Sequence, residues 1–166
     1  MNETTYAQNC QHFLDDIFPE AYALLSPGMN SPAASAELLA IGLQEGRLWY
    51  RKQIGGPARG AYQFEQGGGV AGVLSHPASK AHALSVCKAR KVTAAPNPVY
   101  LALASDDILA TCFARLLLYT LPWRLPAQDD PNTGWAQYIS AWRPGAPHRG
   151  TWDNFYKIAW DTVTTK

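Results

Sequence analysis

The segment from Pro32 to Gln44 constrains the fold most, because it is apolar on nearly every face of the helix that its sequence predicts. Ser31 precedes Pro32, and this pair is typical of a helix start: the serine oxygen can accept from a free amide, and proline fits the first turn. A helix without a polar face must be covered by other elements. We therefore expect a central, buried helix that runs to about Glu45.

Glu45 ends this helix, and its position gives the carboxyl group an unusual environment. A carboxylate that loses water on ionisation has a raised pKa, so we expect Glu45 to be protonated near neutral pH and able to donate a proton. Cleavage of glycosidic bonds requires such a group. The alternative is an exposed glutamate at a helix end, paired with Arg47 or Arg51.

The remaining sequence predicts a mainly α protein. A chain of 166 residues with 47% hydrophobic content can build one full core, so we predict one domain over residues 1–166. Apolar spacing and capping residues indicate further helical segments, which cover residues 5–25, 77–91, 105–121, 133–142 and 151–163. Pro96 and Pro98 predict a break in helical structure. Residues 46–69 are rich in glycine and predict an irregular loop or a small hairpin.

Composition and charge exclude several classes of function. With 14 Lys and Arg against 13 Asp and Glu, the net charge is +1, so we do not expect a nucleic-acid-binding protein. The three cysteines and four histidines lack zinc or disulfide spacing, and we expect no metal and no cofactor. No run of about 18 apolar residues occurs and the start lacks a signal-peptide pattern, so we expect neither a membrane-spanning segment nor unaided export.

The order of these features resembles the lysozyme-like superfamily, in particular the lytic transglycosylases. In that family a helix ends in Glu-Ser, and a Gly-x-x-Gln motif follows about eighteen residues later. Glu45 and Gln63 stand at this spacing, with Gln63 inside the stretch from Gly60 to Phe64. The string from Gln44 to Gly68, with the later stretch 142–145, also resembles short lysozyme-like proteins of tailed bacteriophages.

The resemblance implies a single lysozyme-like domain with a glycine-rich loop or small hairpin after the catalytic helix. It also implies cleavage of peptidoglycan glycan strands between N-acetylmuramic acid and N-acetylglucosamine, with Glu45 as general acid and base. Gln63 would grip an acetamido group or fix the loop beside Glu45. The implied partners are glycan strands and other phage virion proteins. The implied location is the host cytoplasm or the virion, with action on periplasmic peptidoglycan.

Two departures from the family pattern concern the site. Gly46 stands where the family carries serine, and the later Ala-Tyr-Asn motif is missing. Four aromatic residues are candidates for stacking on sugar faces: Tyr62, Tyr119, Tyr138 and Trp142. By their place in the chain, Tyr119, Tyr138 and the stretch 142–145 are the substitutes for the missing motif.

Glu65 leaves the type of reaction open. It is the best candidate for a second carboxylate, which would make the protein a hydrolytic muramidase that uses Glu45 and Glu65. Alternatively, Glu65 pairs with Arg59 across the loop. A further alternative is a non-catalytic phage structural or cell-wall-binding protein with the same fold, and the glycine at position 46 motivates it.

Overall fold

The computed structural model describes residues 1–165 and is mainly helical, which confirms the predicted class. Within these residues the only β-pairing consists of isolated bridges in the 47–65 segment. No helix in this range combines the length and apolarity that a bilayer span requires. The α-helices are α1 (Glu3–His12), α2 (Phe18–Ala23), α3 (Pro32–Gly46), α4 (Ala71–Ser75), α5 (Lys80–Ala89), α6 (Pro96–Ala102), α7 (Asp107–Tyr119), α8 (Pro131–Trp142) and α9 (Trp152–Thr164). The short turns are η1 (Phe13–Ile17), η2 (Pro27–Met29), η3 (Gln66–Val70) and η4 (Arg149–Thr151).

Helix α3 lies in the core, as its sequence predicts. The Ser31 side chain accepts a hydrogen bond from the Ala34 amide at 3.1 Å, which caps the first turn. Most residues from Ala34 to Leu43 are fully buried, and α3 packs against α9 and α7. The helix ends at Arg47, whose left-handed backbone (φ 58°) turns the chain back. The central position of α3 therefore fixes the place of Glu45 near its end.

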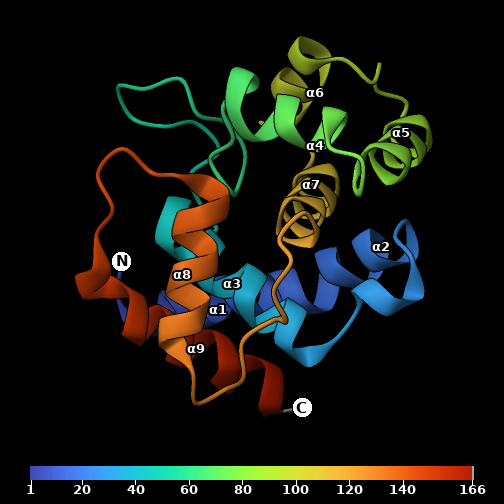
Figure 1. Ribbon diagram of the computed structural model, residues 1–166. Helices are drawn as coiled ribbons and strands as arrows, with labels where there is room; N and C mark the ends of the chain where they lie inside the picture. The colour runs from blue at the N-terminus through green and yellow to red at the C-terminus, as the bar shows by residue number, and fades with distance from the viewer. Residues whose placement is uncertain (166) are drawn as a thin grey trace.

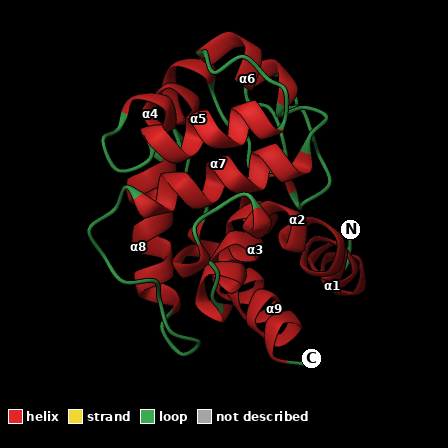
Figure 2. Ribbon diagram, turned by 90° about the vertical axis from the view of Figure 1, so that its right-hand side faces the viewer, coloured by secondary structure: helices red, strands yellow, loops and turns green. Residues whose placement is uncertain are grey.

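Helix α7 crosses the middle of the molecule. Figure 2 shows α4, α5 and α6 on one side of α7, and α1, α2, α3 and α9 on the other. The Asp106 side chain accepts from the Leu109 amide at 2.9 Å and caps α7. In Figure 1 the teal loop that follows α3 and the orange loop that follows α8 project on the same side of the molecule. These two loops border the candidate site.

Two expectations about the middle of the chain hold only in part. A break in helical structure covers residues 90–95, but Pro96 and Pro98 themselves occupy the first turn of α6. Their missing N–H groups leave no hydrogen bond unmade there, because first-turn amides have no partner inside a helix. The glycine-rich stretch also continues into helical structure, through η3 and α4. Gly68 adopts a non-helical backbone within η3 (φ −98°, ψ −108°), which marks a kink.

Glu37 is an acidic residue in the core and faces α8 and α9. It is fully buried, and neither of its oxygens has a hydrogen-bond partner among residues 1–165. A Cβ atom added to Gly134 of α8 would lie 2.8 Å from Glu37 Oε2, so only glycine allows this approach. Burial raises the pKa of Glu37 to about 8. The side chain is therefore neutral at pH 7 and tolerated only in that form.

We predict that Glu37→Gln removes a pH-dependent loss of stability. The carboxyl titrates near 4.5 without burial and near 8 in the fold, so between these values the native state holds one more proton. The free energy of unfolding therefore falls as pH rises from 4.5 to 8, by about 1.4 kcal/mol per unit from this residue. Urea unfolding at pH 5 and pH 8 measures the difference between parent and variant.

The control is Glu20→Gln, which removes the same charge from an exposed position on α2. The stability gain of Glu37→Gln over the parent should grow by several kcal/mol between the two pH values, whereas Glu20→Gln should show no comparable growth. Equal pH dependence in the parent and in Glu37→Gln would contradict the assignment.

Candidate active site

Glu45 lies on the wall of a cavity of about 460 Å³. The carboxyl is partly buried, and its Oε1 accepts a hydrogen bond of 2.7 Å from the Tyr138 hydroxyl. Burial raises the pKa of Glu45 to about 7, which confirms the expected direction. The Tyr138 bond and the charge of Arg47 act in the opposite direction, whereas the charge of Glu65 adds to the rise. Glu45 can therefore both give and take a proton near neutral pH.

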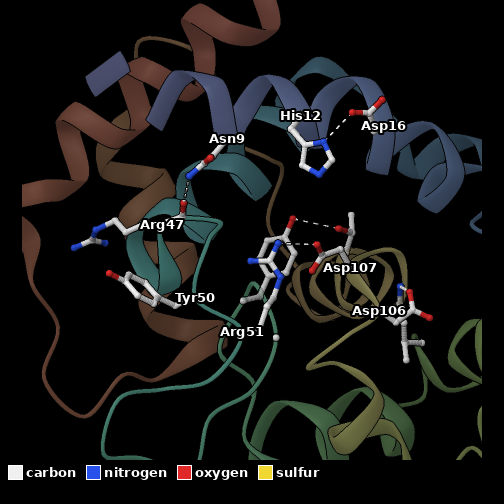
Figure 3. Close-up of polar contacts among 12 residues, drawn as sticks. Asn9, His12, Asp16, Arg47, Tyr50, Arg51, Asp106 and Asp107 are labelled. Carbon is white, nitrogen blue, oxygen red and sulfur yellow. Dashed lines mark hydrogen bonds and ion pairs between the residues drawn. The ribbon is translucent and has the colours of Figure 1, made fainter. Parts of the chain in front are cut away.

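Neither nearby arginine forms an ion pair with Glu45. The Arg47 guanidinium donates to the Leu43 and Gln44 carbonyls and lies over the Phe155 ring, 4.7 Å from its centroid. Arg51 pairs with Asp107 of α7 at 2.6 Å, a contact that Figure 3 shows. The alternative of a glutamate neutralised by either arginine is therefore wrong. These arginines instead stabilise the position of the loop after α3, through the last turn of α3 and through Asp107.

Tyr138 is held in place by the packing of α8 on α9. Its ring is 3% exposed and stacks on Trp152, with ring centroids 5.5 Å apart and planes 13° apart. Trp152 is fully buried and donates its indole N–H to the Pro131 carbonyl at 2.8 Å. Burial first, and then the charge of Glu45, raises the pKa of Tyr138. The hydroxyl therefore stays protonated and remains a donor to Glu45.

Gln63 lines the same cavity as Glu45, so the two residues that the motif pairs lie together. Its backbone is left-handed (φ 49°), and its Nε2 donates to the carbonyls of Gly60 at 2.8 Å and Tyr50 at 3.1 Å. These bonds fix the loop after α3. The amide oxygen makes no hydrogen bond within the described part of the chain, which leaves an acceptor for a ligand.

Trp142 also lines the cavity. Its indole N–H donates to the Tyr62 carbonyl at 2.9 Å, and its ring lies 5.8 Å from that of Phe64. Because the polar atom of Trp142 is satisfied within the protein, the ring can offer only apolar contact. Such a face suits the C–H surface of a sugar ring.

Glu65 is exposed at the margin of the cavity and forms no ion pair with any described residue. The expected pair with Arg59 is wrong. Arg59 donates instead to the backbone carbonyls of residues 56–58 and lies over the ring of Tyr100. Glu65 is therefore a second carboxylate on the same cavity as Glu45.

Two predicted sugar contacts, Tyr62 and Tyr119, do not line the cavity. Tyr62 is fully buried in the core. Its ring packs close to Gly42, and a Cβ atom added to Gly42 would lie 3.3 Å from the ring. Tyr119 is 44% exposed and packs against His82. Leu117 supplies the contact of α7 with the cavity. Tyr119 comes two residues after Leu117, which is more than half a helical turn, so its side chain points to another face of α7. Full burial contradicts the prediction for Tyr62, whereas Tyr119 lies outside this cavity and its contact with a sugar stays a prediction.

Two further residues belong to the site: Gln44, to which the sequence alone assigned no role, and Arg143, which lies in the stretch that replaces the missing motif. Gln44 Nε2 donates to the His148 carbonyl at 2.9 Å, and Gln44 Oε1 accepts from the Thr151 hydroxyl at 2.9 Å. These bonds hold the loop after α8 against the end of α3. Arg143 lines the cavity and begins that loop with a left-handed backbone (φ 49°). The Trp-Arg-Pro-Gly stretch at 142–145 was the available signal.

Several residues that line this cavity have a left-handed backbone conformation. Arg47, Gln63 and Arg143 all have positive φ and all line it. Such conformations cost non-glycine residues energy, of order 1 kcal/mol each, and persist where the surrounding structure enforces them. Their concentration here supports a functional role for the cavity.

Gly46 has room for the serine that the family carries at this position. A Cβ atom at Gly46 would meet the Ala61 carbonyl at 3.4 Å and Gln63 Nε2 at 3.5 Å, which are ordinary contacts. Steric conflict therefore does not explain the glycine. Nothing else in the structure explains it either.

The chain matches no protein-family model, no curated protein and no solved structure. The cavity offers an acid with a pKa near 7, a second carboxylate, a free amide acceptor and an aromatic face. This combination suits a ligand with hydroxyl and amide groups and apolar ring faces, as an N-acetylated oligosaccharide has.

Proposed function

We propose that the protein has a lysozyme-like fold and is a lytic transglycosylase, which cleaves peptidoglycan between N-acetylmuramic acid and N-acetylglucosamine. The observation that carries the proposal is the presence of Glu45, with a pKa of about 7, in one cavity with Gln63. These two residues stand at the spacing of the family motif. Perturbed carboxyl groups in clefts are candidates for catalysis.

The proposed reaction uses Glu45 twice. The protonated carboxyl donates to the glycosidic oxygen as positive charge develops at the anomeric carbon of the muramoyl sugar. The resulting carboxylate then accepts the proton of the C6 hydroxyl as that oxygen bonds to the anomeric carbon and closes a 1,6-anhydro ring. No water is consumed. A pKa near 7 suits both steps because neither protonation state is strongly disfavoured.

The Tyr138 hydrogen bond favours one oxygen of Glu45 as the carrier of the proposed catalytic proton. Oε1 of Glu45 already accepts from the Tyr138 hydroxyl, so Oε2 is the atom that carries the proton to the leaving oxygen. After that transfer, the same hydroxyl stabilises the carboxylate. Trp142 would stack on a sugar ring, and the amide oxygen of Gln63 would accept from an acetamido N–H.

Glu65 supports a second candidate, a hydrolytic muramidase. It lies on the same cavity as Glu45 and forms no ion pair with any residue from 1 to 165, so it could position a water molecule or stabilise the developing charge. Mass analysis of muropeptide products distinguishes the two reactions. We predict 1,6-anhydro ends, and we predict that Glu65→Gln retains them. Products of the parent protein that carry reducing ends would contradict the transglycosylase reaction and support hydrolysis.

A third candidate is a phage structural or cell-wall-binding protein without turnover, for which the glycine at position 46 is the supporting observation. It predicts retention on insoluble peptidoglycan with no cleavage. For each candidate we propose peptidoglycan as the partner and delivery from the host cytoplasm or the virion, where virion proteins would be further partners.

We predict that Glu45→Gln abolishes the clearing of cell-wall suspensions. The two side chains are nearly isosteric, so folding and glycan binding should persist, whereas loss of a general acid should lower the rate by about a hundredfold or more. Turbidity loss measures the rate, and sedimentation with insoluble peptidoglycan measures binding. Glu20→Gln serves as the exposed control and should clear at the parent rate. Equal clearing by Glu45→Gln and the parent would refute the catalytic role.

We predict that Tyr138→Phe moves the alkaline limb of activity to higher pH. The tyrosine hydroxyl stabilises the ionised form of Glu45, so its removal raises the Glu45 pKa above about 7 and keeps the acid protonated longer. Clearing rates across pH 5 to 9 test this. Tyr156→Phe is the matched control, because the Tyr156 hydroxyl donates to the Ala127 carbonyl, away from Glu45. An alkaline limb unchanged from the parent would show that the bond does not tune Glu45.

A further inference from the structure

Two large aromatic side chains are exposed directly after the helix that carries Glu45. Trp49 is 61% exposed and Tyr50 is 45% exposed, although rings of this size are usually well covered. The Trp49 indole N–H and the Tyr50 hydroxyl make no hydrogen bond with any other residue in the described range. Adjacent exposed rings with free polar atoms are typical of a surface that binds something.

The backbone beneath these rings is firmly held. The amides of Trp49 and Tyr50 both donate to the Gly46 carbonyl, at 3.0 and 2.9 Å. The Tyr50 carbonyl accepts from Gln63 Nε2 at 3.1 Å, and the next residue, Arg51, pairs with Asp107. The rings therefore project from a fixed support, which lowers the conformational entropy that a ligand contact would cost.

This support is continuous with the proposed active site. Arg47 and Gln53, on either side of the aromatic pair in sequence, both line the cavity, as does Gln63. Figure 3 shows the Tyr50 ring pointing to the same side as the Arg47 side chain. A ligand that leaves the cavity past Arg47 would thus pass Tyr50, and Trp49 is the exposed neighbour of Tyr50 in the chain.

We propose that Trp49 and Tyr50 form a further sugar-binding subsite, which stacks on an N-acetylhexosamine ring of the glycan strand outside the cavity. The inference rests on the proposed function and names an additional contact of the same substrate. One face of such a ring presents C–H groups to an aromatic ring, while its hydroxyl and acetamido groups can bond to the free indole N–H and phenol. A strand is a polymer, so it extends beyond a cavity of about 460 Å³.

The test measures binding without turnover, in the Glu45→Gln protein. The probes are peptide-free strands of alternating N-acetylglucosamine and N-acetylmuramic acid, from disaccharide to octasaccharide, titrated by calorimetry. We expect Kd to fall as the strand lengthens past the cavity. Trp49→Ala and Tyr50→Ala should each weaken the long strands by about 3- to 10-fold. Both should leave the disaccharide unchanged.

Two kinds of control make the result specific. Trp49→Phe and Tyr50→Phe retain a ring and should retain most of the affinity for long strands. Ile54→Ala changes a residue that is 86% exposed on the same loop, and Trp123→Ala removes an indole that is 50% exposed and does not line the cavity. Both alanine controls should bind every strand with the parent Kd.

The possible failures are distinguishable. In the first case, the protein with Glu45 cleaves peptidoglycan, but Trp49→Ala and Tyr50→Ala bind long strands as tightly as the protein with both rings does. The subsite is then overturned and the proposed function stands. If no strand binds and the protein with Glu45 does not cleave, both proposals are overturned.

Discussion

The hydrogen bond between the Tyr138 hydroxyl and Glu45 Oε1 joins the end of α3 to α8, and the geometry of the site depends on it. It forms because α3 is buried on all sides and presents its last turn to the aromatic cluster of α8 and α9. Gln44, one residue earlier, holds the loop after α8 to the same end of the helix. Gln63 fixes the loop after α3 on the other side. The cavity lies between these anchored segments.

Two glutamates on α3 show that burial alone does not make a catalytic acid. Glu37 has the higher pKa, about 8, but it is sealed in the core without a hydrogen-bond partner in the described chain or access to a ligand. Glu45 is less buried, has a pKa of about 7 and reaches a cavity. Because Tyr138 can stabilise its ionised form, Glu45 can change protonation state at lower cost. Access together with moderate desolvation distinguishes the site.

Local patterns in the sequence predicted much of the fold and the buried environment of Glu45, whereas Gln63 was a candidate only through the family resemblance. The Ser31 cap and the buried face of α3 follow from short-range chemistry, and the structure confirms both. Which face of a turn or helix an aromatic residue occupies is set by tertiary packing, so Tyr62 was misplaced and Tyr119 lies outside the cavity. The role of Gln44 depends on contacts with residues more than a hundred positions away, His148 and Thr151. No local pattern contains that information.

The proposed chemistry depends on a Glu45 carboxyl that keeps its proton until nearly neutral pH. NMR titration of the side-chain carboxyl carbon of Glu45, assigned by comparison with the Glu45→Gln protein, measures this property without any substrate. The account predicts a pKa of about 7. A pKa near the ordinary glutamate value of about 4.3 would show a solvated carboxylate and contradict the account.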